Sequence, residues 1–488
     1  MDKPSDDDQE SVTTTESATT SRSSSHSAIS STANVEALLM SQRQSSPKTL
    51  ARLSAGITDG GMDCYADDRD ALAGFEKFFN NSKFSDVTLT VGDEMFFAHR
   101  LILIKSSEVF ERMLSQQWNG DKKETELVED RVCGKVFPAF LRFLYCNHIT
   151  LHADNTLPIL ILADKYNVDS LRKVCLNYAV THIIPSLSLK EIFHVWFQYG
   201  TKCFHQPLIS ISINLLSSSF QEIVTSSDWE KEWLSLDRDQ LTEFLKCSDL
   251  HINNEFEVWL GVQKWIQAPA HPERRGTYAE KNLADVVPLI RFAFLTPDEL
   301  AQLEQSSIVQ QYPKLFQPQI MMAYKWQALP LSSRVGCREF AGTQFLLRNY
   351  TDLRWDKRLV IPDISSIPKY TEVALKIMTR ASALPPQSWE WELKVHPKGF
   401  SSASEDCRCI LASSVILDQT RAVEYMLSIV DDKKVLRSVV GRKTFSKTRY
   451  SADLEMEKKV GLEELLAENS PLLVNNYLYL QLILKPID

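Results

Sequence analysis

The chain has 488 residues, too many for one hydrophobic core, so we expect roughly two to four domains. Hydrophobic residues make up 44% and charged residues 24% of it, which is typical of a soluble globular protein. The net charge of -9 argues against general nucleic-acid binding, because phosphate contacts need a basic surface. We therefore expect no nucleic-acid partner.

The sequence also argues against secretion and against a membrane span. Its first residues are polar and acidic, whereas a secretory signal has a basic start followed by an apolar stretch. The apolar run at 157–163 is well short of the roughly 20 residues that a transmembrane helix needs. The nine cysteines are odd in number and scattered, which indicates reduced thiols. We expect a cytoplasmic protein, with the nucleus as the alternative, and no membrane partner.

Four regions follow one another along the chain. Residues 1–67 are rich in Ser and Thr, with little to bury, and are expected to form a disordered tail. Residues 68–182 combine apolar helical spacing with an alternating hairpin at 86–98, and therefore predict an α+β domain. Helices are expected at 70–79, 99–115, 133–145, 154–165 and 168–180.

The rest of the chain changes pattern near residue 330. Residues 183–327 show helical periodicity throughout and predict an all-α domain of stacked helix pairs. Residues 336–488 consist of short alternating segments separated by turn residues, which predicts a β-sandwich. Its strands are expected at 373–378, 388–395, 407–416, 422–430, 435–440 and 477–485.

The segment 84–110, FSDVTLTVGDEMFFAHRLILIKSSEVF, resembles the signature of the BTB/POZ domain. Residues 245–250, Glu255, 258–265 and 290–292 resemble the BACK domain that often follows a BTB domain. The C-terminal third is similar to the TRAF/MATH sandwich, chiefly through 391–399 and 473–484. These resemblances imply a multidomain protein made of an α+β BTB/POZ domain, a helical BACK domain and a TRAF/MATH-like β-sandwich.

The BTB resemblance implies a homodimer. Asp86 and Arg100 would lie in a charged pocket at the dimer interface, and His99 would be a buried residue that fixes the next helix. The apolar side chains of the first helix are too many for a solvent-facing surface and suit a hydrophobic interface. They include Leu72, Phe75 and Phe79.

No pattern of residues predicts catalysis, a metal or a cofactor. Asp86 and His99 lack a nucleophile placed by a tight turn, so a structural role is expected. His148 and His152 flank a strand-like segment, which would spread them too far apart to converge on one ion. Cys407 and Cys409 lack the second pair that a zinc site needs, and Trp229, Trp233 and Trp259 have the helical spacing of core residues rather than of an interaction hot spot.

The family resemblance implies an adaptor that brings an unknown protein substrate, held by the C-terminal domain, to a cullin-3 ubiquitin ligase. Trp118 would anchor cullin-3, beside Phe110 and Met113. Family members that bind cullin-3 carry a Glu two residues after this apolar anchor, and Gly120 stands there instead. The alternative is a dimeric scaffold without a ligase, and an enzyme is the third hypothesis.

Overall fold

The computed structural model describes residues 57–58, 61–62, 72–115, 123–382, 387–413, 420–456 and 459–487. Nearly all of the tail predicted over 1–67 lies outside the described residues. Two short strands are placed there, β1 (Ile57–Thr58) and β2 (Gly61–Met62), as an antiparallel pair. Among the described residues, no helix combines the length and the apolar character needed to cross a bilayer.

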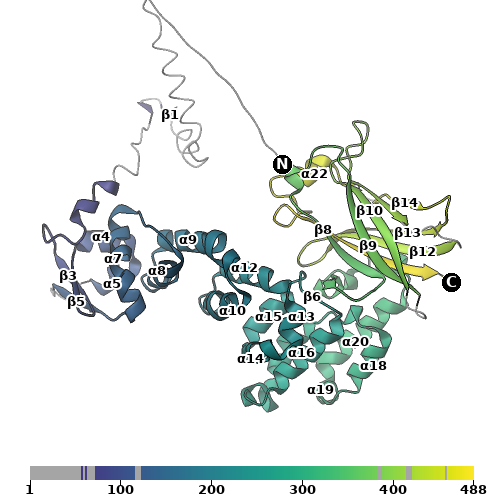
Figure 1. The fold of residues 1–488 in the computed structure, drawn as a ribbon, viewed down its shortest axis with the longest axis horizontal. Coiled ribbons are helices and arrows are strands. Elements are labelled where there is room, and N and C mark those ends of the chain that lie inside the picture. Colours follow the sequence, from purple (N-terminus) through teal and green to yellow (C-terminus); the bar gives the residue numbers. More distant parts are fainter. Residues whose placement is uncertain are drawn as a thin grey trace, which may run out of the picture.

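The N-terminal domain is a three-stranded sheet flanked by helices (Figure 1). The predicted hairpin is confirmed: β3 (Val87–Val91) pairs antiparallel with β4 (Glu94–Ala98) around Gly92, whose φ of +58° favours glycine. A strand that was not predicted, β5 (Glu124–Leu127), runs parallel to β3. The helix predicted over 70–79 is wrong for the described residues: after a helical start at 72–73 the chain makes a turn and then a short 3-10 helix at Glu76–Phe78.

The helix predicted over 99–115 is two helices. The break falls at Ser107, whose hydroxyl accepts a hydrogen bond from the backbone N–H of Phe110 and so caps the second helix. The helices of the domain are α4 (Arg100–Ser106), α5 (Glu108–Met113), α7 (Arg131–Cys146), α8 (Ala153–Lys165) and α9 (Asp169–Tyr178).

The middle of the chain is helical, as predicted. Its three central tryptophans, Trp229, Trp233 and Trp259, are at most 4% exposed, so they are core residues as expected. Two π-helical turns, at Ala179–Ile183 and Ile192–Phe197, bend the chain into this region. The α-helices are α10 (Leu189–Glu191), α11 (Gln198–Lys202), α12 (Gln206–Ser217), α13 (Phe220–Thr225), α14 (Glu230–Ser235), α15 (Arg238–Lys246), α16 (Glu255–Gln267), α17 (Ala279–Val286), α18 (Pro297–Glu304), α19 (Ser307–Gln311), α20 (Pro313–Ala328) and α21 (Leu331–Arg334).

The C-terminal third consists of two four-stranded antiparallel sheets, with strand orders β14-β11-β10-β9 and β13-β12-β15-β8. Their facing side chains form one hydrophobic core, in which Trp391 of β10 and Leu427 of β12 are fully buried. The six predicted strands are present, and β8 and β14 were missed. The elements are β8 (Asp356–Ile361), β9 (Val373–Ser382), β10 (Gln387–His396), β11 (Arg408–Ser413), β12 (Arg421–Val430), β13 (Val435–Phe445), β14 (Ser451–Leu454), β15 (Leu478–Ile487) and the helix α22 (Leu462–Leu466).

The core of the N-terminal domain continues without a break into the helical region, and from there to the edge of the sandwich at Met426 and Ile483. In Figure 1 the sandwich lies above helices α16 to α20, and the N-terminal domain lies at the far end of the molecule. A two-residue strand pair, β6 (His251–Ile252) with β7 (Asn349–Tyr350), also joins the helical region to the segment that leads into the sandwich. Because packing crosses the proposed boundaries, the predicted domain limits stay predictions.

Candidate interaction surfaces

Asp86 and Arg100 are joined by a hydrogen bond between the side chain of Asp86 and the main chain of Arg100. The Asp86 carboxylate accepts a hydrogen bond of 2.7 Å from the backbone N–H of Arg100, the first residue of α4. The Arg100 guanidinium donates to the backbone carbonyl of Leu114, at 2.8 Å. Within one chain, Asp86 therefore acts as a cap on α4, a role that the sequence did not suggest. Their place at a dimer interface stays a prediction.

His99 connects three segments, although it is half-buried rather than buried as expected. Its Nδ1 lies 2.9 Å from the hydroxyl of Tyr145 in α7, and its Nε2 lies 3.0 Å from the backbone carbonyl of Lys83. The ring also packs edge-on against Phe78. With both nitrogens in hydrogen bonds, His99 fixes the start of α4 against α7, as the resemblance implied.

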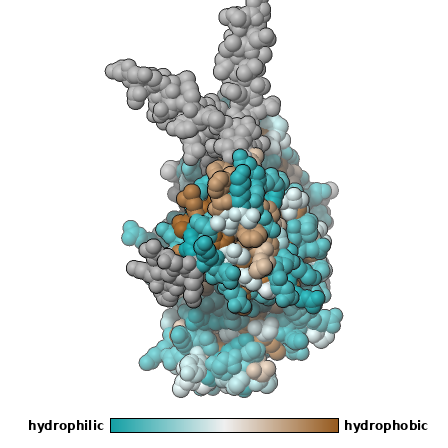
Figure 2. All heavy atoms as spheres, turned by 90° about the vertical axis from the view of Figure 1, so that its left-hand side faces the viewer, coloured by the Kyte–Doolittle hydropathy of each residue, from teal (hydrophilic) through white to brown (hydrophobic). Residues whose placement is uncertain are grey.

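Apolar side chains are exposed at the end of the N-terminal domain. Five of them fall between residues 75 and 101, and we call them the N-terminal apolar face. Figure 2 looks onto this end of the molecule and shows apolar side chains gathered among hydrophilic ones. The face consists of Phe75 (44% exposed), Phe84 (77%), Met95 (67%), Phe97 (43%) and Leu101 (79%).

The predicted interface residues lie partly on this face. Phe75 is exposed, whereas Leu72 and Phe79 are half-buried, and the ring of Phe79 packs edge-on against Tyr145. The side chain of Asn80 accepts a hydrogen bond from the backbone N–H of Phe97, at 3.0 Å. The segment 75–84 is thereby held beside β4, which brings the exposed side chains of the two segments to one side of the domain.

The residues predicted to contact cullin-3 differ in exposure. Phe110 is fully buried, with its ring stacked on Tyr166 at a centroid distance of 4.6 Å, so it supports α5 from inside and is corrected to a core residue. Met113, in the last turn of α5, is half-buried. Trp118 and Gly120 lie outside the described residues.

A buried polar network joins the helical region to the sandwich. At its centre Glu255, the first residue of α16, forms an ion pair with Arg348 at 3.1 Å, and both side chains are completely buried. Glu255 also accepts hydrogen bonds from the hydroxyl of Tyr350 (2.6 Å) and the backbone N–H of Arg291 (2.8 Å). Burial, together with the charge of Glu255, raises the pKa of Tyr350 well above its usual value.

Arg348 uses its remaining donors to satisfy the ends of helices. Its Nη2 donates to the backbone carbonyls of Leu245 and Leu289, both at 2.9 Å, and its Nη1 donates to that of Cys247. These carbonyls lie at or near the ends of α15 and of the turn after α17. A buried charge persists only when it is paired and hydrogen-bonded, and Arg348 meets both conditions. The network therefore fixes the segment that leads into the sandwich to the helical region.

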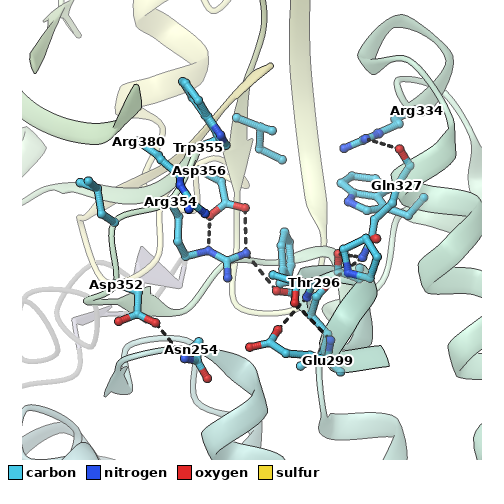
Figure 3. Close-up of a pocket in the computed structure, with 17 residues that line it drawn as sticks. Asn254, Thr296, Glu299, Gln327, Arg334, Asp352, Arg354, Trp355, Asp356 and Arg380 are labelled. Atoms are coloured by element: carbon cyan, nitrogen blue, oxygen red, sulfur yellow. Dashed lines mark hydrogen bonds and ion pairs between the residues drawn. The ribbon is translucent and has the colours of Figure 1, made fainter. Parts of the chain in front are cut away.

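Next to this network is a cavity of about 360 Å³ between α18 and the strand β8 (Figure 3). Arg354 points across it and donates to Asp356 at 2.7 and 3.1 Å and to the backbone carbonyl of Phe294 at 2.9 Å. Below Arg354 in the same view, Asn254 donates to Asp352 at 2.8 Å. Because these polar groups pair with one another across the gap, we interpret the cavity as a seam between the two domains.

Side chains of the kinds that bind metal ions also meet near the start of α12, where they take part in hydrogen bonds. Asp164 of α8 accepts from Arg172 at 2.7 Å, and lies 2.6 Å from Nε2 of His205 at the start of α12. One group of three possible ligand atoms occurs in the described residues, from Asp164, Cys203 and His205, within 4.8 Å of one another. Since Asp164 is already paired with a guanidinium and zinc prefers four ligands, we interpret this group as a link between the first two domains.

The two histidines considered for a metal site in the sequence are separated, though not by a strand. Residues 148–152 form no regular secondary structure, which corrects the strand expected there. His148 lies beside Arg142, with 3.2 Å between Nδ1 and Nη1, and His152 caps the start of α8.

Comparison with known families identifies the first two domains. Residues 75–183 match the model of the BTB/POZ domain, and residues 194–305 match that of the BACK (BTB And C-terminal Kelch) domain. The chain therefore carries a BTB/POZ domain followed by a BACK domain, with a C-terminal region of antiparallel sheets. This is a layout of adaptor proteins, which are generally not enzymes.

The relatives match different shares of this chain. BTB/POZ domain-containing protein 17 from Xenopus laevis is 24% identical over 442 residues, which are 84% of this chain and 89% of the relative. The Homo sapiens protein of that name is 27% identical, over 59% of this chain and 58% of the relative. Kelch-like protein 41 from Homo sapiens is 27% identical over 50% of this chain and 38% of its own. Among solved structures, the BTB domain of zebrafish PATZ1 is 27% identical and matches 24% of this chain and 95% of its own, with a TM-score of 0.19.

The sequence analysis missed the junction residues. Glu255 and Arg348 lie 93 positions apart, so nothing local reveals their pairing. One signal was present: Arg348 directly follows the apolar pair Leu346 and Leu347, and Tyr350 stands two residues after it, which is unusual for a surface arginine.

Proposed function

We propose that this chain is a dimeric, non-enzymatic adaptor that self-associates through its BTB/POZ domain and holds a protein partner with its C-terminal sandwich. The observation that carries the proposal is the N-terminal apolar face, where Phe84 and Leu101 are 77% and 79% exposed. Apolar side chains gathered on one side of a folded domain are typical of a protein-interaction surface. The family of the domain supports a second copy of this chain as the occupant.

The finer proposal is that the adaptor serves a cullin-3 ubiquitin ligase in the cytoplasm. Two observations support it: the order BTB then BACK, and the similarity of half of the chain to Kelch-like proteins. Trp118, which follows α5, is the proposed anchor, because large aromatic side chains carry much of the energy of an interface. Phe110 is no longer part of this proposal, since its side chain is buried.

One feature of the sequence favours a second candidate, a dimeric scaffold without a ligase. Gly120 stands where cullin-binding relatives carry a Glu. A charge-assisted hydrogen bond is worth roughly 1.5–3 kcal/mol, so its absence corresponds to an affinity about ten- to hundredfold lower.

Light scattering of the full chain tests self-association. We expect twice the mass of one chain at micromolar concentration, and a single-chain mass for Leu101→Asp. Met321→Asp is the matched control, because Met321 is 66% exposed on α20, away from the face, and this variant should remain a dimer. A wild-type protein that is monomeric at these concentrations would refute the proposal.

Calorimetry of the full chain against the cullin-3 N-terminal domain separates ligase adaptor from scaffold. An adaptor should bind, Trp118→Ala should weaken binding by about tenfold or more, and Gly120→Glu should strengthen it. Gln117→Ala, next to the anchor, is the control and should bind like wild type. Absence of heat from wild type and from Gly120→Glu at micromolar concentrations would support the scaffold.

A further inference from the structure

A cleft lies between the BACK domain and the sandwich. We call it the interdomain cleft; its volume is about 1060 Å³. One wall comes from α12 and from the end of α15 through Asp249, and the other comes from β8, the turn between β12 and β13, and residues 474–479. Ligand pockets occur preferentially between domains and measure roughly 300–1,000 Å³, so this cleft has the room for more than a small metabolite.

The inner wall of the cleft holds an arginine with an unused donor. Arg358 of β8 is only 6% exposed, and its Nε donates to Asp249 at 3.0 Å. Its guanidinium stacks on the ring of Tyr479, with 4.4 Å between the central carbon and the ring centroid. Nη1, in contrast, is buried and has no hydrogen-bond partner in the described chain. A buried charged donor without a partner is costly, so this group is suited to a ligand that brings an acceptor.

A second buried arginine gives the same wall an excess of positive charge. Arg291 is 2% exposed, and its Nη1 and Nη2 donate to neutral acceptors, the carbonyl of Leu346 and the hydroxyl of Ser248, both at 2.8 Å. Burial, and next the charge of Arg348, lower the pKa of Arg291 to about 9. Two guanidiniums thus line the inner wall, and one of them, that of Arg358, is paired with the carboxylate of Asp249. This excess of positive charge favours an anionic ligand.

The geometry distinguishes a carboxylate from a phosphate. The Nη1 nitrogen of Arg358, with its two N–H bonds, has no partner among the described residues, and the Asp249 carboxylate already lies 3.0 Å from Nε. The carboxylate of Asp249 repels any anionic ligand of Arg358, and it repels a single negative charge less than the nearly double charge of a phosphate monoester. Beside this position, Tyr477 is 40% exposed and its ring lies 6.3 Å from that of Tyr479, which offers an aromatic surface to neighbouring residues of a peptide.

We propose that the interdomain cleft binds an extended segment of a partner protein through an acidic side chain, whose carboxylate accepts a hydrogen bond from Nη1 of Arg358. This inference rests on the proposed adaptor function, because it names the chemistry by which the adaptor holds its partner. The site lies in the wall between two domains that the Glu255–Arg348 network holds in a fixed arrangement. The cleft is therefore formed before the partner arrives, which reduces the entropy lost on binding.

Fluorescence anisotropy of the full chain with labelled peptide pools tests the proposal. The pools have blocked termini and random sequence around one central residue, which is Glu, Gln or phosphoserine. We expect the Glu pool to bind about tenfold more tightly than the Gln pool, as a charge-assisted hydrogen bond predicts. Equal binding of the Glu and Gln pools, no binding of any pool, or tightest binding of the phosphoserine pool would overturn it.

Three variants localise the effect. Arg358→Gln should abolish the preference for Glu, whereas Arg238→Gln, a matched change on α15 outside the cleft, should keep it. Asn214→Trp adds a bulky side chain to the α12 wall, where Asn214 is exposed, and should weaken binding of the Glu pool without touching Arg358. If Arg358→Gln does not fold, Asn214→Trp decides. Binding of the Glu pool by Asn214→Trp that is as tight as by wild type, or a Glu preference retained in a folded Arg358→Gln, would refute the site.

The experiments distinguish a failure of this inference from a failure of the proposed function. Arg358 lies in the sandwich, so a folded Arg358→Gln should still give the dimer mass in light scattering and the cullin-3 heat of wild type. A wild-type chain that forms the dimer and binds cullin-3 but shows no preference for the Glu pool removes this inference alone. Loss of dimer and cullin-3 binding, with the peptide preference kept, removes the proposed function instead.

Discussion

Replacing Arg348 by methionine should destabilise the junction between the BACK domain and the sandwich. The change removes the only arginine that forms an ion pair with Glu255 in the described chain, while methionine keeps most of the side-chain volume. Glu255 then keeps the hydroxyl of Tyr350 and the backbone N–H of Arg291, but no countercharge at hydrogen-bond distance.

The expected loss follows from the burial of the pair. Both side chains are 0% exposed, and removing one partner of such a pair costs about 3–5 kcal/mol. The carbonyls of Leu245, Cys247 and Leu289 lose their donor as well. At about 2–4 °C for each kcal/mol in domains of this size, the melting temperature should fall by about 6 °C or more.

Calorimetric unfolding of the full chain measures this loss, and a double-mutant cycle with Glu255→Gln isolates the pair. Glu255→Gln should also destabilise the protein, because it leaves the Arg348 charge without its carboxylate. The double variant should lose less than the sum of the two single losses, by about 0.5–3 kcal/mol. Additive losses, or a melting temperature of Arg348→Met close to that of wild type, would refute the idea that this pair joins the two domains.

Two further changes test local interpretations. Asp86→Ala should cost about 1 kcal/mol in a denaturant titration, the usual value of a helix cap, because Asp86 bonds to the backbone N–H of Arg100; a loss of 3 kcal/mol or more would indicate a buried ion pair instead. His396 is 4% exposed, and burial lowers its pKa below the usual 6.5 despite Glu372 at 3.5 Å. Its neutral form is thus the one that the fold favours, so the stability is complete above pH 6.5 and is lost as the pH falls from there through the lowered pKa. His396→Phe should unfold with a weaker pH dependence between about pH 7 and about pH 5, and an unchanged pH profile would contradict this assignment.

Local patterns in the sequence predicted most of the elements and the class of the first two domains. The alternation of Val87, Leu89 and Val91 around the turn at Gly92 predicts the hairpin, because side chains in a strand alternate between its two faces. The helical spacing of the tryptophans predicted a core, and all three are buried. These spacings involve residues that are close in the sequence, so they can be recognised without knowledge of the tertiary structure.

The edges of the elements and the sites depend on contacts between distant residues. The sequence analysis predicted that Phe110 contacts cullin-3. Its ring packs on Tyr166 instead, and this contact decides its burial. β5 forms only because β3 offers it a parallel partner. Glu255 and Arg348 are separated by 93 positions, and Arg358 and Asp249 by 109. The sequence determined which residues are charged or apolar, but the tertiary structure decided which charges are buried together, because burial and pairing depend on which surfaces meet.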